Sequence, residues 1–293
     1  MEMLEHSRSI RISAVALFLL AGAGFTAGRG QTAGLGLNPA KVEVEVHPGE
    51  ERTVGFRIES PPSDVAVRGR LMLSLTDWMI DEQASVSYVE PGTLPYSASP
   101  WVVFSPTDLS TTSGGSYLVR VTVRVPPTAE PGVYRSGIFI QERPPATPPN
   151  LGQHLLYFRF RYAFTIYVIV PPVAGRGELV DVRLQRDPEG LRLVCELRNH
   201  GSRHLRPRIS WSIQDAEQKE VASIKNKETT VLLPHSRMLS QSLVGPGLAP
   251  GRYEVSAQID FNDGSFLQGV RRVIQIPAAE AVASSRPPEE QKP

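Results

Sequence analysis

The sequence contains one cysteine, Cys195, among 293 residues. No disulfide can therefore form within the chain, and a disulfide-rich extracellular scaffold is excluded. Cys195 lies in the apolar segment LRLVCEL, where alternation of apolar and polar residues is typical of a strand. A lone cysteine in this position predicts a small buried hydrophobic side chain.

The sequence also lacks an excess of either charge. It has 31 Lys and Arg against 30 Asp and Glu, which gives a formal net charge of +1. Such a balance gives no general electrostatic attraction to nucleic acid or to an anionic membrane surface. We therefore expect no nucleic-acid partner.

Long hydrophobic runs are missing as well. The longest run, residues 12–23, follows Arg8 and Arg11 and precedes a series of small residues. It is shorter than the roughly 20 residues that cross a bilayer, and its flanks are typical of a secretory signal peptide. We expect residues 1–33 to contain this signal, with cleavage between 23 and 33, and the mature chain to have no stable membrane anchor.

No arrangement of residues indicates catalysis. His200 and His204 are close in sequence, but Gly201 between them indicates a turn, so their spacing is weak support for a metal pair. Nucleophile elbows and glycine-rich phosphate loops are absent. We predict a non-enzymatic protein without cofactor or metal.

The densest carboxylates of the first half of the chain lie in the segment TDWMIDE. They are Asp77, Asp81 and Glu82. We interpret this segment as a solvated turn beside Trp78, with cation binding as the weaker alternative.

Short β-like segments, bounded by Pro, Gly, Ser or Asp, fill the chain from Lys41 to Val170 and resume after Pro171-Pro172. The second series is interrupted by a lysine-rich middle part, which is followed by the strand-like segment TTVLLP, and it includes a hairpin signal at residues 262–264, Asn-Asp-Gly. We predict an all-β fold of two immunoglobulin-like β-sandwich domains in tandem. Their expected bounds are 36–172 and 174–277, with an exposed proline-rich loop at 144–152 and a disordered tail at 278–293.

Residues 157–172, YFRFRYAFTIYVIVPP, change character along their length. Phe158, Phe160 and Tyr162 share one face of an extended strand, and Arg159 and Arg161 share the other. The second half is apolar on both faces, which predicts a strand enclosed on both sides. The aromatic face of the first half either meets the core of its own domain or is offered to another chain.

Several motifs occur together in an order that resembles the periplasmic pilus-assembly (fimbrial) chaperone family. They are NPAKVEVEV, the Asp77-Trp78 pair, SPWVVFSP, YLVRVTVRVPP and PGVYRSGIFIQERPP, and they cover residues 36–172. The second domain matches only in position and class. The resemblance implies a chaperone that caps an unfinished secreted or surface β-rich subunit by donating a strand. Phe158, Phe160 and Tyr162 are then the side chains that enter the groove of the subunit.

The resemblance also implies a site for the C-terminal carboxylate of the subunit. In the family, one basic residue on the first strand and another near the end of the donor strand bind this group. Lys41 matches the first position. At the second position this sequence offers Thr165, Ile166 or Tyr167, so one of the two charges is missing.

Other functions stay open on the sequence alone. A structural or adhesive cell-envelope protein, built from the same sandwiches, would bind a polysaccharide or a neighbouring protein through its loops. A hydrolase or metalloenzyme is the third class, because catalytic groups can converge from distant loops. A donor strand with a free edge also allows self-association.

Overall fold

The computed structural model describes residues 34–62, 69–143, 160–187, 190–245, 247–265 and 267–276. In these ranges the regular structure is β-strand, apart from the short 3-10 turn η1 (Ser99–Trp101). They belong to one compact unit and contain two sandwiches, which confirms the predicted fold class. The predicted signal peptide, proline-rich loop and tail lie outside the described residues. The domain boundaries stay predictions.

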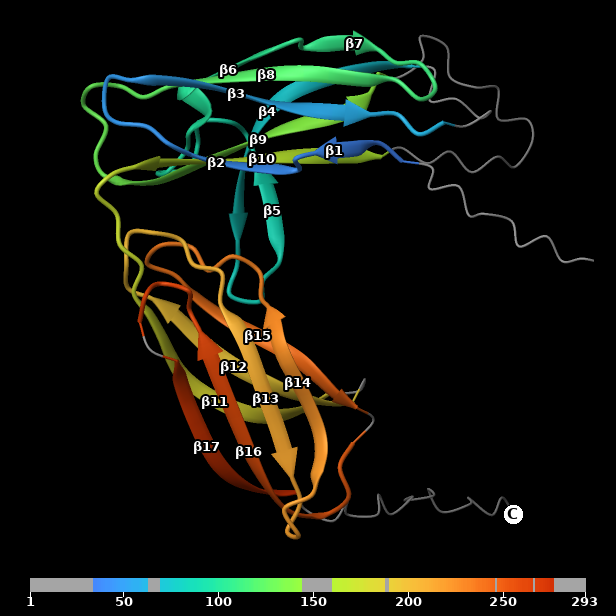
Figure 1. Cartoon of the computed structure of the whole chain (residues 1–293), viewed down its shortest axis with the longest axis vertical. Coiled ribbons are helices and arrows are strands. Elements are labelled where there is room, and N and C mark those ends of the chain that lie inside the picture. Colours follow the sequence, from blue (N-terminus) through green and yellow to red (C-terminus); the bar gives the residue numbers. More distant parts are fainter. Residues whose placement is uncertain are drawn as a thin grey trace, which may run out of the picture. The chain divides into compact units, whose positions relative to one another are not determined.

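The first sandwich has two sheets (Figure 1). One has the strand order β1 (Gly36–Asn38), β3 (Glu51–Glu59), β8 (Ser116–Arg124), β6 (Val102–Ser105). The other has the order β2 (Lys41–Glu45), β10 (Arg161–Val170), β9 (Gly132–Glu142), β4 (Arg70–Ile80), β5 (Val86–Val89), with β7 (Asp108–Ser110) also beside β4. Their strand pairs are antiparallel except β2 with β10, which is parallel.

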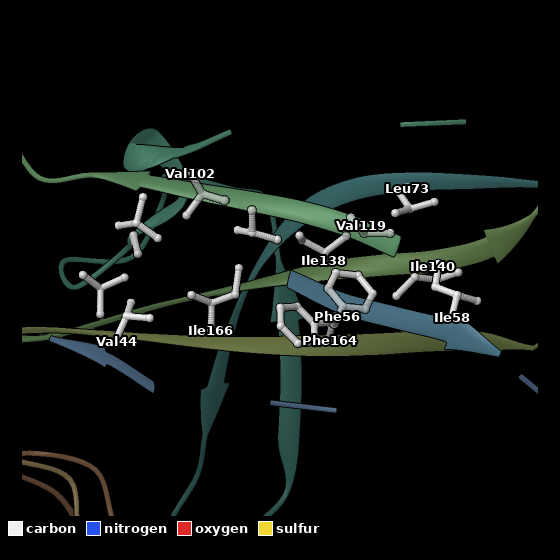
Figure 2. Close-up of a cluster of buried hydrophobic side chains, with 14 of the residues drawn as sticks. Val44, Phe56, Ile58, Leu73, Val102, Val119, Ile138, Ile140, Phe164 and Ile166 are labelled. Atoms are coloured by element: carbon white, nitrogen blue, oxygen red, sulfur yellow. The ribbon is translucent and has the colours of Figure 1, made fainter. Parts of the chain in front are cut away.

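Alternating apolar residues form the core between these two sheets (Figure 2). Val119, Val121 and Val123 on β8 are fully buried, because every second side chain of a strand points to the same face. From the opposite sheet, Phe164 stacks on Phe56 with ring centroids 3.9 Å apart. The apolar second half of β10 is therefore one wall of this core.

The enclosure predicted for the second half of β10 is confirmed on both faces. Ile166 and Val168 point into the core of the first sandwich. Tyr167 and Ile169 point the other way and pack in a second cluster with Val231 and Leu233, which come from the second sandwich. A strand buried on both faces reads as a continuous apolar run, as this one does.

The second sandwich has a three-stranded and a four-stranded sheet. The first has the order β11 (Gly177–Asp187), β12 (Gly190–Asn199), β15 (Arg237–Gly245). The second has the order β14 (Glu220–Glu228), β13 (Arg208–Gln214), β16 (Gly251–Asp260), β17 (Gln268–Ile276). Cys195 is buried in their shared core, as predicted, and burial raises the pKa of its thiol to about 12. The Asn-Asp-Gly signal lies in the β16–β17 connection, where Asn262 and Gly264 have positive φ angles.

Two local predictions in this half are wrong. The lysine-rich segment left outside the predicted strands forms β14, because an edge strand can leave its lysines in solvent. The segment TTVLLP, predicted to be a strand, forms only an isolated bridge between Leu232 and Leu205. Its apolar residues are divided instead, since Leu232 packs in the second core and Val231 and Leu233 in the cluster around Tyr167.

The stacked phenylalanines provide a test of this packing. We expect Phe164→Ala to lower the free energy of unfolding by about 3–5 kcal/mol, because it leaves a cavity beside Phe56. Phe160→Ala is the matched control, since that side chain is 53% exposed, and it should change stability by less than about 0.5 kcal/mol. Urea unfolding measures both. Equal losses for the two variants would contradict the assignment of the core face.

Candidate functional site

Strand β10 is hydrogen-bonded on one side along its whole length and on the other side along only half. Antiparallel β9 pairs with it from Arg161 to Val170. On the opposite side, β2 pairs only with Thr165–Ile169. In the described ranges, residues 161–164 therefore have a strand on one side and none on the other.

The unpaired side has a defined set of backbone groups. The Thr165 N–H donates to the Ala40 carbonyl at 3.1 Å, and the Ile169 carbonyl accepts from Val46 N–H at 3.0 Å. Because alternate residues of a strand direct their N–H and C=O groups to the same side, those of Arg161 and Ala163 point the same way. A strand added here would lie in line with β2 and meet its first residue, Lys41.

The open edge exists because the first strand changes sheets. β1 pairs with β3 in one sheet, and its chain then crosses at Asn38-Pro39 and continues as β2 in the other. Proline has no N–H for a ladder and suits such a crossing. The crossing decides that β10 gains a neighbour only from Thr165 onward.

The structure separates the three aromatic residues predicted to bind a partner. Tyr162 packs at the margin of the first core, and its hydroxyl accepts a hydrogen bond from the Leu35 N–H at 3.0 Å. Phe160 is 53% exposed, with its ring centroid 6.4 Å from that of Tyr162. Phe158 lies outside the described residues. The role of these side chains in binding stays a prediction.

Lys41 lies where the open edge of β10 ends and the pairing with β2 begins. It is exposed and pairs in register with Thr165, which identifies the residue opposite it. Among the described residues no carboxylate forms an ion pair with its ammonium group. Its predicted role in binding is likewise untested and stays a prediction.

Glu43, two residues from Lys41 on the same face of β2, joins the two sandwiches. Its carboxylate lies 3.2 Å from the His204 Nε2 and accepts a hydrogen bond from the Arg206 guanidinium at 2.8 Å. The hydrogen bond with His204, helped by Arg206, lowers the pKa of Glu43 to about 2, against the effect of burial. Lys41 is therefore on the face of the sheet that contacts the second sandwich.

Tyr167 supports this cluster from β10. The His204 ring stacks on it with centroids 4.6 Å apart, and the Arg206 guanidinium lies 5.4 Å from its ring centre. Burial raises the pKa of the Tyr167 phenol. The second sandwich thus covers the face of the sheet at Glu43 and Tyr167. In the described part of the chain, the edge of β10 at residues 161–164, on the other side of Lys41, is open.

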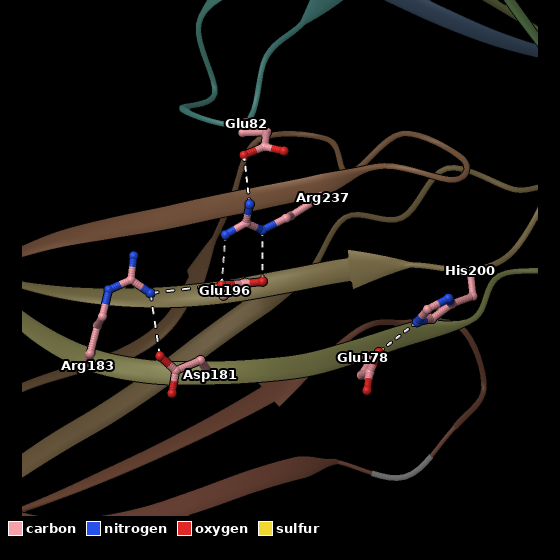
Figure 3. A network of polar contacts seen from close by, with 7 residues as sticks. All are labelled: Glu82, Glu178, Asp181, Arg183, Glu196, His200 and Arg237. Carbon is pink, nitrogen blue, oxygen red and sulfur yellow. Dashed lines mark hydrogen bonds and ion pairs between the residues drawn. The ribbon is translucent and has the colours of Figure 1, made fainter.

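A second connection comes from the β4–β5 turn (Figure 3). Arg237 donates to Glu82 at 3.0 Å and, through two nitrogens, to Glu196 at 2.8 and 3.0 Å. The Leu239 N–H also donates to the Glu82 carbonyl at 2.7 Å. These bonds connect the turn of the first sandwich to strands β12 and β15 of the second.

The solvated-turn interpretation of TDWMIDE is wrong for Asp77. This carboxylate is fully buried and accepts hydrogen bonds from the hydroxyls of Ser97 at 2.8 Å and Ser99 at 2.6 Å. A buried carboxylate requires such donors, and here they hold the loop before β6. Asp81 does lie in an exposed turn, where it accepts from the N–H groups of Gln83 and Ser85.

Sequence reasoning missed the partners of Glu43. Alternation in KVEVEV places Lys41 and Glu43 on one face, but His204 and Arg206 come from a turn more than a hundred residues later. His200 pairs with Glu178 at 2.6 Å instead of joining His204. In the described ranges, no group of His, Cys, Asp and Glu has the arrangement of a metal site.

A search for membrane-crossing helices in the described residues finds no helix with the necessary length and apolar character.

No family model matches the sequence, and no curated protein matches it either. Solved structures that the chain is similar to include the class 5 fimbriae chaperone CfaA (11% identity, TM-score 0.41, 83% of this chain and 100% of that chain). They also include a chaperone–tip adhesin complex of CFA/I fimbriae (12%, 0.42, 84% and 100%). A third is the CsuC–CsuE pre-assembly complex of Acinetobacter baumannii Csu pili (11%, 0.43, 82% and 98%).

The Glu43 cluster predicts a pH dependence of stability. The pKa of Glu43 is about 2 in the folded protein against an ordinary value of 4.5, so the ionised carboxylate stabilises the fold above pH 4.5. This contribution is lost as the pH falls from 4.5 through about 2. We therefore expect Glu43→Gln to have a lower Tm than wild type at neutral pH and the difference to shrink over that window. A difference that is constant with pH would contradict the assignment.

Proposed function

We propose that the protein is a periplasmic, non-catalytic chaperone that binds and caps secreted or surface β-rich subunits of the pilus type by donor-strand addition. The observation that carries this proposal is the half-paired strand β10. Its unpaired side ends at Lys41, so the edge and the cation adjoin each other. The order of motifs in residues 36–172, which resembles the fimbrial chaperone family, supports the same function.

The edge supplies the main-chain part of the interaction. A subunit that lacks one strand leaves its own edges unpaired, and the N–H and C=O groups of Arg161 and Ala163 offer partners for one of them. Each such hydrogen bond contributes about 0.5–1.5 kcal/mol net. Pairing of this kind depends little on side chains, which suits a protein that receives subunits before they are complete.

Side chains on the inner face of β10 supply apolar contact. Phe160, immediately before β10, is 53% exposed, and burying its side chain in the groove of the subunit would contribute about 1.5–3 kcal/mol. Tyr162 is on the same face but already contacts the core and Leu35. Tyr162 therefore adds to subunit binding only if the subunit packs against the first core and leaves these contacts of Tyr162 in place.

Lys41 sets the direction of the added strand. A strand on this edge meets β2 at Lys41, so one of its ends lies beside the ammonium group. A C-terminal carboxylate is attracted there and an N-terminal ammonium group is repelled. The added strand therefore runs parallel to β10, and Thr165, which pairs in register with Lys41, adds a hydroxyl but no second positive charge.

The rival is a structural or adhesive envelope protein, and the contacts of Tyr162 with its own core favour it. In that case the same strand edge has no role in capture. Substituting Phe160 distinguishes the two functions. Phe160→Ser should weaken capture of a strand peptide by about 10- to 150-fold without unfolding if the chaperone function is correct, whereas a structural module shows no peptide capture to lose.

The carboxylate contact gives a direct test. We expect a synthetic strand peptide of alternating Val and Gln with a free C-terminus to bind the purified protein more tightly than the same peptide with a C-terminal amide. Lys41→Ala should remove this difference, Lys41→Arg should keep most of it, and the Tm should change little. Fluorescence anisotropy measures the binding.

Lys225→Ala is the matched control, because it removes an exposed lysine from β14 of the second sandwich. It should bind like wild type. If amidation has no effect on wild-type binding, Lys41 does not bind the carboxylate. If neither peptide binds, strand addition itself is wrong.

A further inference from the structure

Arg161 borders the open edge on the face opposite to Phe160 and Tyr162. It is the first residue of β10 and pairs in register with Gln141 on β9. The side chain is held in place, since its Nε donates to the Gln141 side-chain oxygen at 2.9 Å. Its guanidinium carbon also lies 4.7 Å from the centre of the Phe139 ring. Contacts of this kind fix a long side chain before any partner arrives.

The positive charge of Arg161 is not neutralised within the described part of the chain. No carboxylate there forms an ion pair with it, whereas Arg70 and Arg143, on the same sheet region, pair with Asp108 at 2.9 and 3.4 Å. Only one of its donors is used by Gln141, so the terminal nitrogens have capacity for an acceptor. Lys41, at the other end of the open edge, is also without a described carboxylate. Two cations thus border the stretch where a strand would be added.

The neighbouring side chain leaves Arg161 accessible from the edge. Ala163, the next residue on this face, ends at a methyl group, and Arg161 itself is exposed. A strand paired with β10 would place its outward side chains about 5 Å from those of Arg161 and Ala163. An Asp or Glu at such a position reaches the guanidinium, and a Lys or Arg is repelled by it.

We infer that Arg161 selects strands with an acidic side chain on the outward face, beside the first residue of β10. This inference rests on the proposed function and adds a property of the client. In the strand that a client adds to β10, the side chains on the inward face are apolar in any client, because they pack in a core. These side chains therefore discriminate poorly among clients. The outward face contributes selectivity by charge and determines the register in which the added strand pairs.

Three synthetic strand peptides test the inference. They share inward Val residues and a free C-terminus, and all their outward positions are Glu, Gln or Lys, so that the result does not depend on the register. Wild-type protein should bind the Glu peptide about two- to fivefold more tightly than the Gln peptide, and the Lys peptide more weakly still. The differences should shrink at high salt.

Variants separate Arg161 from the general charge of the protein. Arg161→Gln should reduce the preference for the Glu peptide over the Lys peptide. Arg161→Glu should reduce this preference further, because its carboxylate repels the Glu peptide and attracts the Lys peptide. Arg120→Glu makes the same change in charge at an exposed position of β8 in the other sheet. It should leave the preference for the Glu peptide unchanged. Thermal unfolding of each variant confirms that the protein is folded, and Arg161→Gln keeps the test valid if the reversal destabilises β10.

The outcomes distinguish this inference from the function it rests on. Equal binding of the three peptides by wild-type protein, or an unchanged preference in Arg161→Gln, overturns the role of Arg161 while strand addition stands. Binding of none of them overturns the proposed function and the inference together. A preference for Glu that depends on Arg161 and not on Arg120 supports it.

Discussion

The hydrogen bonding of β10 is the constraint on which the rest of the structure depends. This strand lies between β9 and β2, yet β2 reaches only its second half. The half with two neighbours is buried on both faces, by the first core and by the cluster around Tyr167. The half with one described neighbour has one face toward the core margin and a cationic outer face. One strand is therefore an internal wall at one end and, in the described ranges, an edge with a single neighbour at the other.

The two ends of β10 depend on each other. Burial of Phe164, Ile166 and Val168 anchors the strand in the first core, so that residues 161–164 are held extended without a second partner. Such preorganisation lowers the entropy cost of adding another strand. Glu43, Tyr167 and His204 close the sheet face immediately below Lys41. In the proposed function, an added strand would thereby be limited to the open stretch and would end beside Lys41.

Much of the fold could be predicted from the sequence, because the side chains of a strand alternate between its two faces with a period of two residues. The alternation in KVEVEV and in the aromatic segment indicated which residues share a face, and the doubly apolar end of β10 indicated enclosure on both sides. The burial of Cys195 could be predicted from the same alternation. The lysines of β14 hid an edge strand, since a solvated edge removes the apolar signal on which the prediction relied.

The rest of the site could not be predicted, because it depends on contacts between distant segments. Nothing near Glu43 in sequence indicates His204 or Arg206, and nothing near Asp77 indicates that Ser97 and Ser99 bury it. The hydrogen bond from Leu35 to Tyr162 depends on where the first strand changes sheets. Motif order indicated a donor strand, but only the pairing of Lys41 with Thr165 shows where its open part ends.

Hydrogen–deuterium exchange at single-residue resolution tests the central claim most directly. By strand alternation, the amides of Tyr162 and Phe164 point to β9 and those of Arg161 and Ala163 point to the open edge. In the free protein the account predicts slow exchange for the first pair and fast exchange for the second. Adding a strand peptide with a free carboxylate should slow the second pair selectively. Protection of Arg161 and Ala163 in the free protein, or fast exchange after the peptide has bound, would contradict the account.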